Sequence, residues 1–245
     1  NATGGVIHVI TKEPNQDPEA DLQLSYGSYQ TVEMSGYANA GLGEGVAVNV
    51  AAYFRDQGKG YGHNLANGKE INFQDDFAVR GQLLIEPTAT LSLRYSADYT
   101  RQESDIGPGR QVLLGSRNGF GDTRAGGIQD GNFDFGPEGR NSQWGVSQNA
   151  VLDVGGASLR SITAYRKFKF FALYDLDTTP LYVLNARRVE DGSTFQQEFL
   201  LEGETGNLKY TAGFFYLNLK NIQRPVATFG APGPGNIDRF SVQET

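Results

Sequence analysis

The segment 102–141 holds the residues best suited to binding chemistry. Guanidinium groups bind carboxylates and other oxyanions through paired hydrogen bonds, and aromatic rings stack on planar ligands. We therefore expect an anionic, ring-bearing ligand to contact some of the following residues: Arg110, Arg117, Phe120, Arg124, Phe133 and Phe135. The alternative is a solvated surface loop whose acids and bases pair with one another.

Carboxylates in the same segment are ligands of the type that Ca²⁺ prefers. Asp130, Asp134 and Glu138 follow one another closely in the chain, and carboxylate oxygens are hard-cation ligands. The same acids can equally pair with nearby arginines, so we assign no metal site. Whether a loop binds calcium stays open.

Catalytic chemistry finds no support in the residue types. The chain has two histidines, His8 and His63, and no cysteine. A Ser-His-Asp arrangement would have to use one of these histidines, and His63 lies in a Gly-rich stretch. The stretch GKGYG lacks the strand-to-helix setting and the GK[ST] ending of a phosphate loop. We expect no enzyme, no catalytic residue and no cofactor.

The elements that carry these residues are predicted to be β-strands. In TLSLRYSADYT (90–100) apolar residues alternate with polar ones, a period of two that indicates a strand with one apolar and one wet face. Five more segments, beginning near residues 21, 46, 76, 144 and 194, alternate in the same way. Four residues fall on the wet face and are expected to face a lumen: Arg80, Arg94, Asp98 and Glu198.

The connections between the predicted strands alternate in length. Short ones lie at 41–45, 86–90, 154–158 and 203–207, and long ones at 56–75, 102–141, 175–193 and 224–239. An antiparallel meander with tight turns at one end and long loops at the other is typical of outer-membrane barrels. Tyr26, Phe54, Tyr99 and Trp144 fall at loop-proximal strand ends, where aromatic girdles lie. The alternative is a soluble β-sandwich with Val46, Leu91, Leu93 and Leu152 in its inner core.

Composition agrees with strands and tight turns. Aromatic residues make up 11% of the chain, with 32 glycines. No apolar run approaches the 18 residues of a transmembrane helix, but a spanning β-strand needs only about 9–11 residues. The net charge of -7 argues against a nucleic-acid partner, which would require a basic face.

The opening stretch NATGGVIHVITKEP resembles the end of the plug domain of TonB-dependent outer-membrane receptors. There, an Asn-Ala-Thr/Ala-Gly-Gly turn leads into a Val-Ile-x-Val/Ile-x-Thr-Lys-x-Pro strand. The plug-end motif includes Asn1, Gly4, Gly5 and Thr11, whereas His8 departs from the usual small polar residue. The segment 20–61 resembles the first barrel strands of the family, with a short Tyr-Gly-Ser-Tyr loop. STFQQEFLLEG, with Glu198 at an acidic family position, resembles another strand pair.

The resemblance implies a domain division and a set of partners. Residues 1–18 would be the C-terminal end of the plug, and residues 19–245 the N-terminal part of a transmembrane antiparallel up-and-down β-barrel. About nine strands are expected, with DRFSVQET starting a tenth, where the family has about twenty-two. The chain would therefore be a fragment of a monomeric receptor, in contact with outer-membrane lipid and, through its N-terminal part, with the TonB energy-transducing complex.

The function that the resemblance implies is active import of a scarce solute across the outer membrane of a Gram-negative bacterium. A metal chelate such as a ferric siderophore is the expected ligand, although the sequence does not identify the solute. A passive porin-like channel is the alternative. It would share the strands but would have no need of the plug-end motif.

Overall fold

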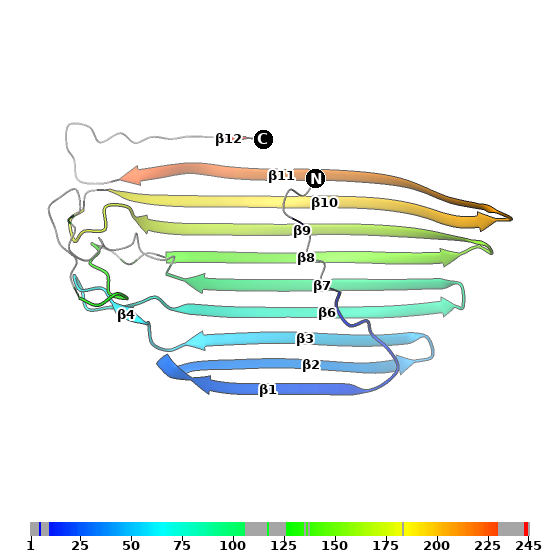
Figure 1. Cartoon of the computed structure of the whole chain (residues 1–245), viewed down its shortest axis with the longest axis horizontal. Coiled ribbons are helices and arrows are strands. Elements are labelled where there is room, and N and C mark those ends of the chain that lie inside the picture. The colour runs from blue at the N-terminus through cyan, green and yellow to red at the C-terminus, as the bar shows by residue number, and fades with distance from the viewer. Residues whose placement is uncertain are drawn as a thin grey trace.

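Nine long strands form the body of the structure, which is a computed structural model that describes residues 5, 10–105, 117, 126–134, 136, 138–182, 184–229 and 243–244. Within these residues the large sheet is antiparallel, and its strands pair in sequence order with β4 and β5 set apart as a small hairpin in a loop (Figure 1). The strands of the large sheet are β1 (Glu19–Gly27), β2 (Thr31–Gly43), β3 (Val46–Gln57), β6 (Gln74–Thr88), β7 (Leu91–Ser104), β8 (Glu138–Asp153), β9 (Ala157–Asp175), β10 (Asn185–Thr205), β11 (Leu208–Phe229) and β12 (Gln243–Glu244). The hairpin consists of β4 (Gly62–His63) and β5 (Glu70–Ile71).

The predicted meander is confirmed. Tight turns join β2 to β3, β6 to β7, β8 to β9 and β10 to β11 at one end of the sheet, and the long connections lie at the other end (Figure 1). One of these turns depends on Gly45, which has φ +68°, and a Cβ there would lie 2.4 Å from the carbonyl oxygen of Glu86. The short connection between β1 and β2 at the loop end is the 3₁₀ turn η1 (Ser28–Gln30).

The last long strands extend further toward the loops than the sequence predicts. β10 begins at Asn185, inside the loop expected at 175–193, and β11 continues to Phe229. Both faces of such an extension meet water, so its residues no longer alternate between apolar and polar, although backbone pairing continues. β12 pairs with β11 through Ile222 and Gln223, at the place where a tenth strand was expected. No helix among the described residues has the length and apolarity required to cross a bilayer.

The sheet has one apolar face, and its side chains are exposed. Residues directly opposite in an antiparallel pair lie on the same face, so the registers assign each side chain to a face. The apolar face includes the exposed residues Leu22, Leu24, Val50, Phe54, Trp144, Val146, Phe199 and Phe214. An exposed apolar surface of this extent indicates a partner or a membrane.

On the apolar face, each long strand except β2 has an aromatic residue at the loop end of its apolar run. The position of this residue shifts regularly from strand to strand. In strand order these residues are Tyr26, Phe54, Phe77, Tyr99, Trp144, Tyr165, Phe195 and Tyr216. In the pairing registers the position moves away from the loops by two residues at each of four places: Tyr26 to Phe54, Phe77 to Tyr99, Trp144 to Tyr165, and Phe195 to Tyr216. That is one residue per strand from β1 to β11. With about 3.4 Å per residue and about 4.8 Å between strands, it corresponds to a strand tilt of about 35°.

Candidate functional site

The residues before β1, here called the N-terminal segment (residues 10–18), lie on the polar face of the sheet (Figure 1). Their main anchor is Asn39 on β2, whose side chain is 4% exposed. The amide nitrogen of Asn39 donates to the backbone oxygen of Asn15 at 3.1 Å and to that of Asp17 at 2.6 Å, and its oxygen accepts from the N–H of Asn15 at 3.2 Å. A single wall side chain thus satisfies three backbone groups of a segment that has no strand partner of its own.

Further contacts hold the N-terminal segment along β2 and β3. Asn49 donates to the carbonyl oxygen of Lys12 at 3.2 Å, and Gln16 donates to that of Val46 at 3.1 Å. Gly41 permits this approach, because a Cβ at that position would lie 2.1 Å from Oε1 of Gln16. Pro14 is the one residue of the segment that is buried. The segment is therefore attached to the wall at several separate points along β2 and β3.

Two ion pairs complete the attachment. Glu13 pairs with Arg94 on β7, four strands away from β1 in the sheet, and Lys12 pairs with Glu19 at the start of β1. All four side chains are between 29% and 64% exposed, so water screens both pairs. The buried amides, rather than these charges, supply most of the binding of the segment.

The four residues expected to face a lumen share the face that carries the N-terminal segment. Arg80 lies opposite Asp98, Arg94 contacts Glu13, and Glu198 lies opposite Ile162. Asp98 forms a bidentate pair with Arg166 of β9, at 2.9 and 2.8 Å, across the intervening strand β8. Gly145 makes this reach possible, since a Cβ there would lie 2.9 Å from the Arg166 guanidinium. Sequence reasoning missed Arg166, because its partner is two strands away.

At the opposite end of the strands, two loops are bound to each other. Asn64 lies in the loop 58–73 and is fully buried, and its side chain donates to the carbonyl oxygen of Phe133 at 3.1 Å and accepts from the N–H of Phe133 at 2.9 Å. Two backbone bonds run beside it: Leu65 N–H donates to Gly131 and Gly131 N–H donates to His63. The ring of Phe133 covers Gly131, where a Cβ would collide with it at 1.9 Å. We call residues 58–73, 126–134 and 176–184 the loop cluster.

Two acids, Asp130 and the buried Asp105, hold backbone groups of the loop cluster. Asp130 accepts from the N–H groups of His63 at 3.0 Å and Gly127 at 2.6 Å. Asp105 accepts from the N–H groups of Asn72 and Phe73. Burial raises the pKa of Asp105, and these two N–H donors act in the opposite direction.

The loop 176–184 is held by Asp175, the last residue of β9. One carboxylate oxygen accepts from the N–H groups of Asp177 at 3.1 Å and Thr178 at 2.7 Å, while the other is buried with no hydrogen-bond donor among the described residues. Asp134 lies nearby and accepts from Asn185 at 2.9 Å. Burial raises the pKa of Asp175 to about 7. The Thr178 N–H opposes the rise, whereas the carboxylates of Asp177 and Asp134 add to it.

The loop residues expected to bind a ligand fall into three groups. Arg117 is exposed and lies in an isolated β-bridge. Phe133 is fully buried, so its ring supports the loop cluster and offers no surface for stacking while the loops stay together. The remaining four, Arg110, Phe120, Arg124 and Phe135, lie outside the described residues, as do Asn1 and Gly4 of the plug-end motif and His8. Gly5 of that motif has φ +108°, and Thr11 is exposed in the N-terminal segment.

The carboxylates considered for calcium do not converge. Asp130 accepts from the backbone N–H of His63 in the loop 58–73, and Asp134 accepts from the side chain of Asn185. Glu138 pairs with Arg140 at 2.5 Å. Within the part of the chain that the structure describes, no group of three or more acidic or histidine side chains is arranged for a metal ion.

Several solved outer-membrane receptors share this architecture. The structure superposes on the ferric yersiniabactin uptake receptor FyuA of Yersinia pestis with a TM-score of 0.72 at 12% identity, over 90% of this chain and 33% of that one. The ferripyoverdine receptor of Pseudomonas aeruginosa gives a TM-score of 0.64 at 12% identity, over 94% and 31%. The alcaligin outer-membrane receptor FauA of Bordetella pertussis gives 0.55 at 10% identity, over 89% and 30%. No protein-family model matches the chain, and no curated protein sequence does.

These likenesses confirm, at the level of the fold, the resemblance to TonB-dependent outer-membrane receptors that the sequence predicts. They confirm the fold class as well, a partial antiparallel barrel sheet. The chain spans about a third of the length of the receptors that it matches. By their names the three matched proteins are receptors, one for uptake of ferric yersiniabactin, one for ferripyoverdine and one for alcaligin.

Proposed function

We propose that this chain is part of a TonB-dependent receptor in the outer membrane of a Gram-negative bacterium, and that the whole protein imports a ferric siderophore. The attachment of the N-terminal segment to the polar face is the observation that carries the proposal. In this assignment residues 1–18 end the plug and residues 19–245 begin the barrel wall. A passive channel requires no such segment, so the buried Asn39 anchor counts against a porin.

The geometry of the apolar face supports insertion in a membrane. Strands of outer-membrane barrels tilt by about 35–45°, and the shift of the aromatic residues corresponds to about 35°. In a sheet tilted by that angle, the eight aromatic residues come to lie at one level, as a girdle at a lipid boundary requires. The exposure of the apolar face counts against a soluble sandwich, in which a second sheet would cover that face.

The polar face supports a ligand path that is closed by the plug. Arg94 binds the N-terminal segment through Glu13, while Asp98 on the same strand and its partner Arg166 on β9 lie nearer the loops. A pull on the N-terminal segment would therefore act first on contacts with the wall. In this proposal TonB supplies the force through a part of the protein outside this sequence, and the protein works as a monomer without catalysis or a resident cofactor.

Uptake by cells that carry the full-length gene tests the proposal. We expect import of ⁵⁵Fe bound to the cognate siderophore, found by screening a panel of chelates, in cells with TonB and none above background in an isogenic strain without TonB. Undiminished uptake in the strain without TonB would identify a passive channel instead. Binding of the chelate at 0 °C should persist in both strains, because binding precedes the energised step.

A further inference from the structure

Three buried oxygen atoms without a hydrogen-bond donor lie at the loop end of β9 and β10 (Figure 1). They are Oδ2 of Asp175, Oδ1 of Asp134 and Oδ1 of Asn185. Asp175 is 2% exposed and Asn185 is fully buried. Within the part of the chain that the structure describes, nine buried side-chain polar atoms lack a hydrogen-bond partner, and three of the nine are these oxygens. Buried acceptors nearly always have a partner, because leaving them without one is costly.

The strand register and the loop contacts bring these three side chains together. Asp175 ends β9 and Asn185 begins β10, and the two residues pair directly, so their side chains share a face with Cβ atoms about 4.5–5.5 Å apart. The amide nitrogen of Asn185 donates to Oδ2 of Asp134 at 2.9 Å. The carboxyl groups of Asp134 and Asp175 lie within hydrogen-bonding reach of each other. Asp134 is held in this place because its N–H donates to the carbonyl oxygen of Thr179 at 3.1 Å.

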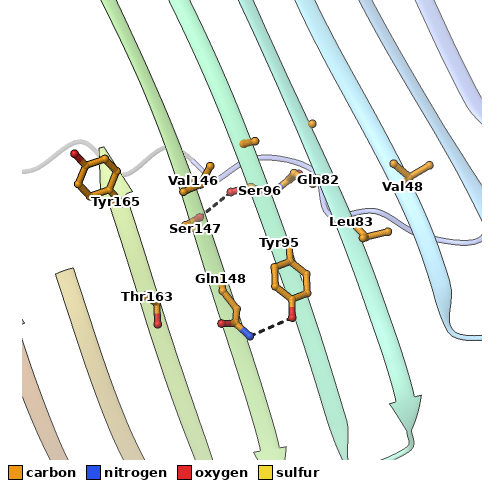
Figure 2. A pocket seen from close by; sticks show the side chains of 12 residues that line it. Val48, Gln82, Leu83, Tyr95, Ser96, Val146, Ser147, Gln148, Thr163 and Tyr165 are labelled. Carbon is orange, nitrogen blue, oxygen red and sulfur yellow. Dashed lines mark hydrogen bonds between the residues drawn. The ribbon is translucent and has the colours of Figure 1, made fainter. Parts of the chain in front are cut away.

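Polar side chains in the middle of the sheet have partners, in contrast. Figure 2 shows the hydroxyl groups of Ser96 and Ser147 bonded to each other at 2.8 Å, and Gln148 donating to the hydroxyl of Tyr95 at 3.3 Å. Each of these pairs joins a donor to an acceptor. The three oxygens at the loop end are all acceptors, so they cannot pair with one another unless a proton or a cation is added.

The charge around the three oxygens favours a cation. The charged groups that act on Asp175 are the carboxylates of Asp177 and Asp134. Asp177 is occupied within its own loop, where it accepts from the N–H of Leu184 at 2.6 Å. A proton shared by Asp175 and Asp134 would satisfy two of the oxygens and leave that of Asn185 without a donor. A divalent cation satisfies all three and offsets both negative charges.

We infer that Asp134, Asp175 and Asn185 bind a calcium ion that ties the loop cluster to the ends of β9 and β10. Ca²⁺ takes six to eight oxygen ligands in flexible geometry, whereas Mg²⁺ requires a near-ideal octahedron. Two carboxylates and one amide oxygen are a small set of protein ligands, so we expect a Kd of about 10⁻⁴–10⁻³ M, the range of extracellular calcium modules. Of the acids considered from the sequence, Asp130 and Glu138 are not part of this site.

Hydrogen exchange in the full-length receptor, purified in detergent, tests the site at pH 8. We compare exchange in EGTA with exchange in about 10 mM CaCl₂, because an ion with a Kd of about 1 mM should then slow exchange in residues 176–184 by about tenfold. Exchange in the middle of β7 should stay the same. About 10 mM MgCl₂ should slow exchange in residues 176–184 less than about twofold. Equal slowing by both ions would reveal general screening of the carboxylates and overturn the calcium site.

D175N separates the ion from the other roles of the side chain. In EGTA, residues 176–184 should exchange more slowly in D175N than in the wild type, because the amide removes a buried charge beside Asp134. Calcium should slow the wild type and leave D175N unchanged, so the difference between them closes. D134N should lose the calcium response as well. The matched control is D153N, an exposed acid at the turn end of β8, which should respond like the wild type. A response in D175N equal to that of D153N would overturn the inference.

Equilibrium dialysis against ⁴⁵Ca gives a second measurement on the same proteins. D175N and D134N should each bind one ion fewer per receptor than the wild type and D153N, whatever other calcium sites the full-length protein has. Equal stoichiometry in all four proteins would overturn the inference. The site does not depend on the imported solute, so a failure of TonB-dependent uptake would leave it standing.

Discussion

The N-terminal segment and the loop cluster both fix irregular backbone at the sheet, but they do so with different chemistry. The N-terminal segment relies on wall amides, chiefly Asn39, and on ion pairs open to water. The loop cluster relies on side chains that are wholly buried, Asn64 and Phe133. Hydrogen bonds from a few wall amides contribute about 1 kcal/mol each, whereas removing a buried aromatic anchor costs about 3–5 kcal/mol. In the proposed assignment, the difference suits a plug end that detaches from the wall and loops that keep their arrangement.

The largest effect should come from F133A in the loop cluster. Removing a fully buried phenylalanine side chain costs about 3–5 kcal/mol, and here the cost falls on the contact between loops rather than on the sheet. We expect amides of residues 58–73 to exchange with deuterium far faster, while those of β7 and β8 remain protected. L181A, at an exposed position in the same cluster, is the control and should have little effect. Equal protection in F133A and the wild type would show that the ring does not hold the loops.

N39A tests the other side of the comparison. Asn39 binds three backbone groups of the N-terminal segment, and its loss should weaken the attachment by about 2 kcal/mol, because buried partners are left unpaired. The readout in the full-length receptor is the rate at which a cysteine introduced at Gln16 reacts with a maleimide, with a rise of roughly tenfold or more expected.

The matched control is N218A, an exposed asparagine on β11. It should leave the labelling rate at the wild-type value. If N39A labels no faster than N218A, the segment is held by something other than the wall amides, and the contrast with the loop cluster disappears.

How far the sequence determines these regions depends on the range of the interactions. The alternation in TLSLRYSADYT is local, so it predicts β7 and places Arg94 and Asp98 on the polar face. No local pattern identifies Asn15 or Lys12 as the partners of Asn39 and Asn49. Asn64 and Phe133 are 69 residues apart, and only the folded meander brings their loops together.

The strand ends beyond the apolar band cannot be predicted from the sequence for a related reason. Residues 185–192 carry charged side chains on both faces of β10, so a period of two is not visible there, although backbone pairing continues to Asn185. The arginines and aromatic residues of the segment 102–141 are visible in the sequence. The sequence predicts Phe133 to be an exposed ligand contact, because burial by a distant loop leaves no local signal.

Asp175 offers a way to change the loop cluster with pH. It lies ten residues beyond Tyr165, outside the apolar band. Its pKa is raised to about 7 in the fold from an ordinary value near 4, so the folded state binds more protons than the unfolded state between these values. Stability of the cluster is therefore highest below pH 4, falls as the pH rises to about 7, and is flat above it.

D175N should remove this dependence. The amide keeps an oxygen for the Thr178 N–H without a charge, so hydrogen exchange of residues 176–184 should slow by about tenfold at pH 8 relative to the wild type. At pH 4 the two proteins should match after correction for intrinsic exchange. A wild type whose corrected exchange does not vary between pH 4 and 8 would contradict the raised pKa.

The smallest effect should come from E13Q, which breaks the ion pair with Arg94. Both side chains are partly exposed, and such pairs contribute roughly 0–1 kcal/mol. The labelling rate at residue 16 should rise less than about fivefold at low salt and converge with the wild-type rate at 1 M salt, where charges are screened within about 3 Å. R94Q should match E13Q, because either change removes the same pair. A change as large as that of N39A would mean that charge, and not the buried amide, holds the N-terminal segment, which would reverse the distinction between the two regions.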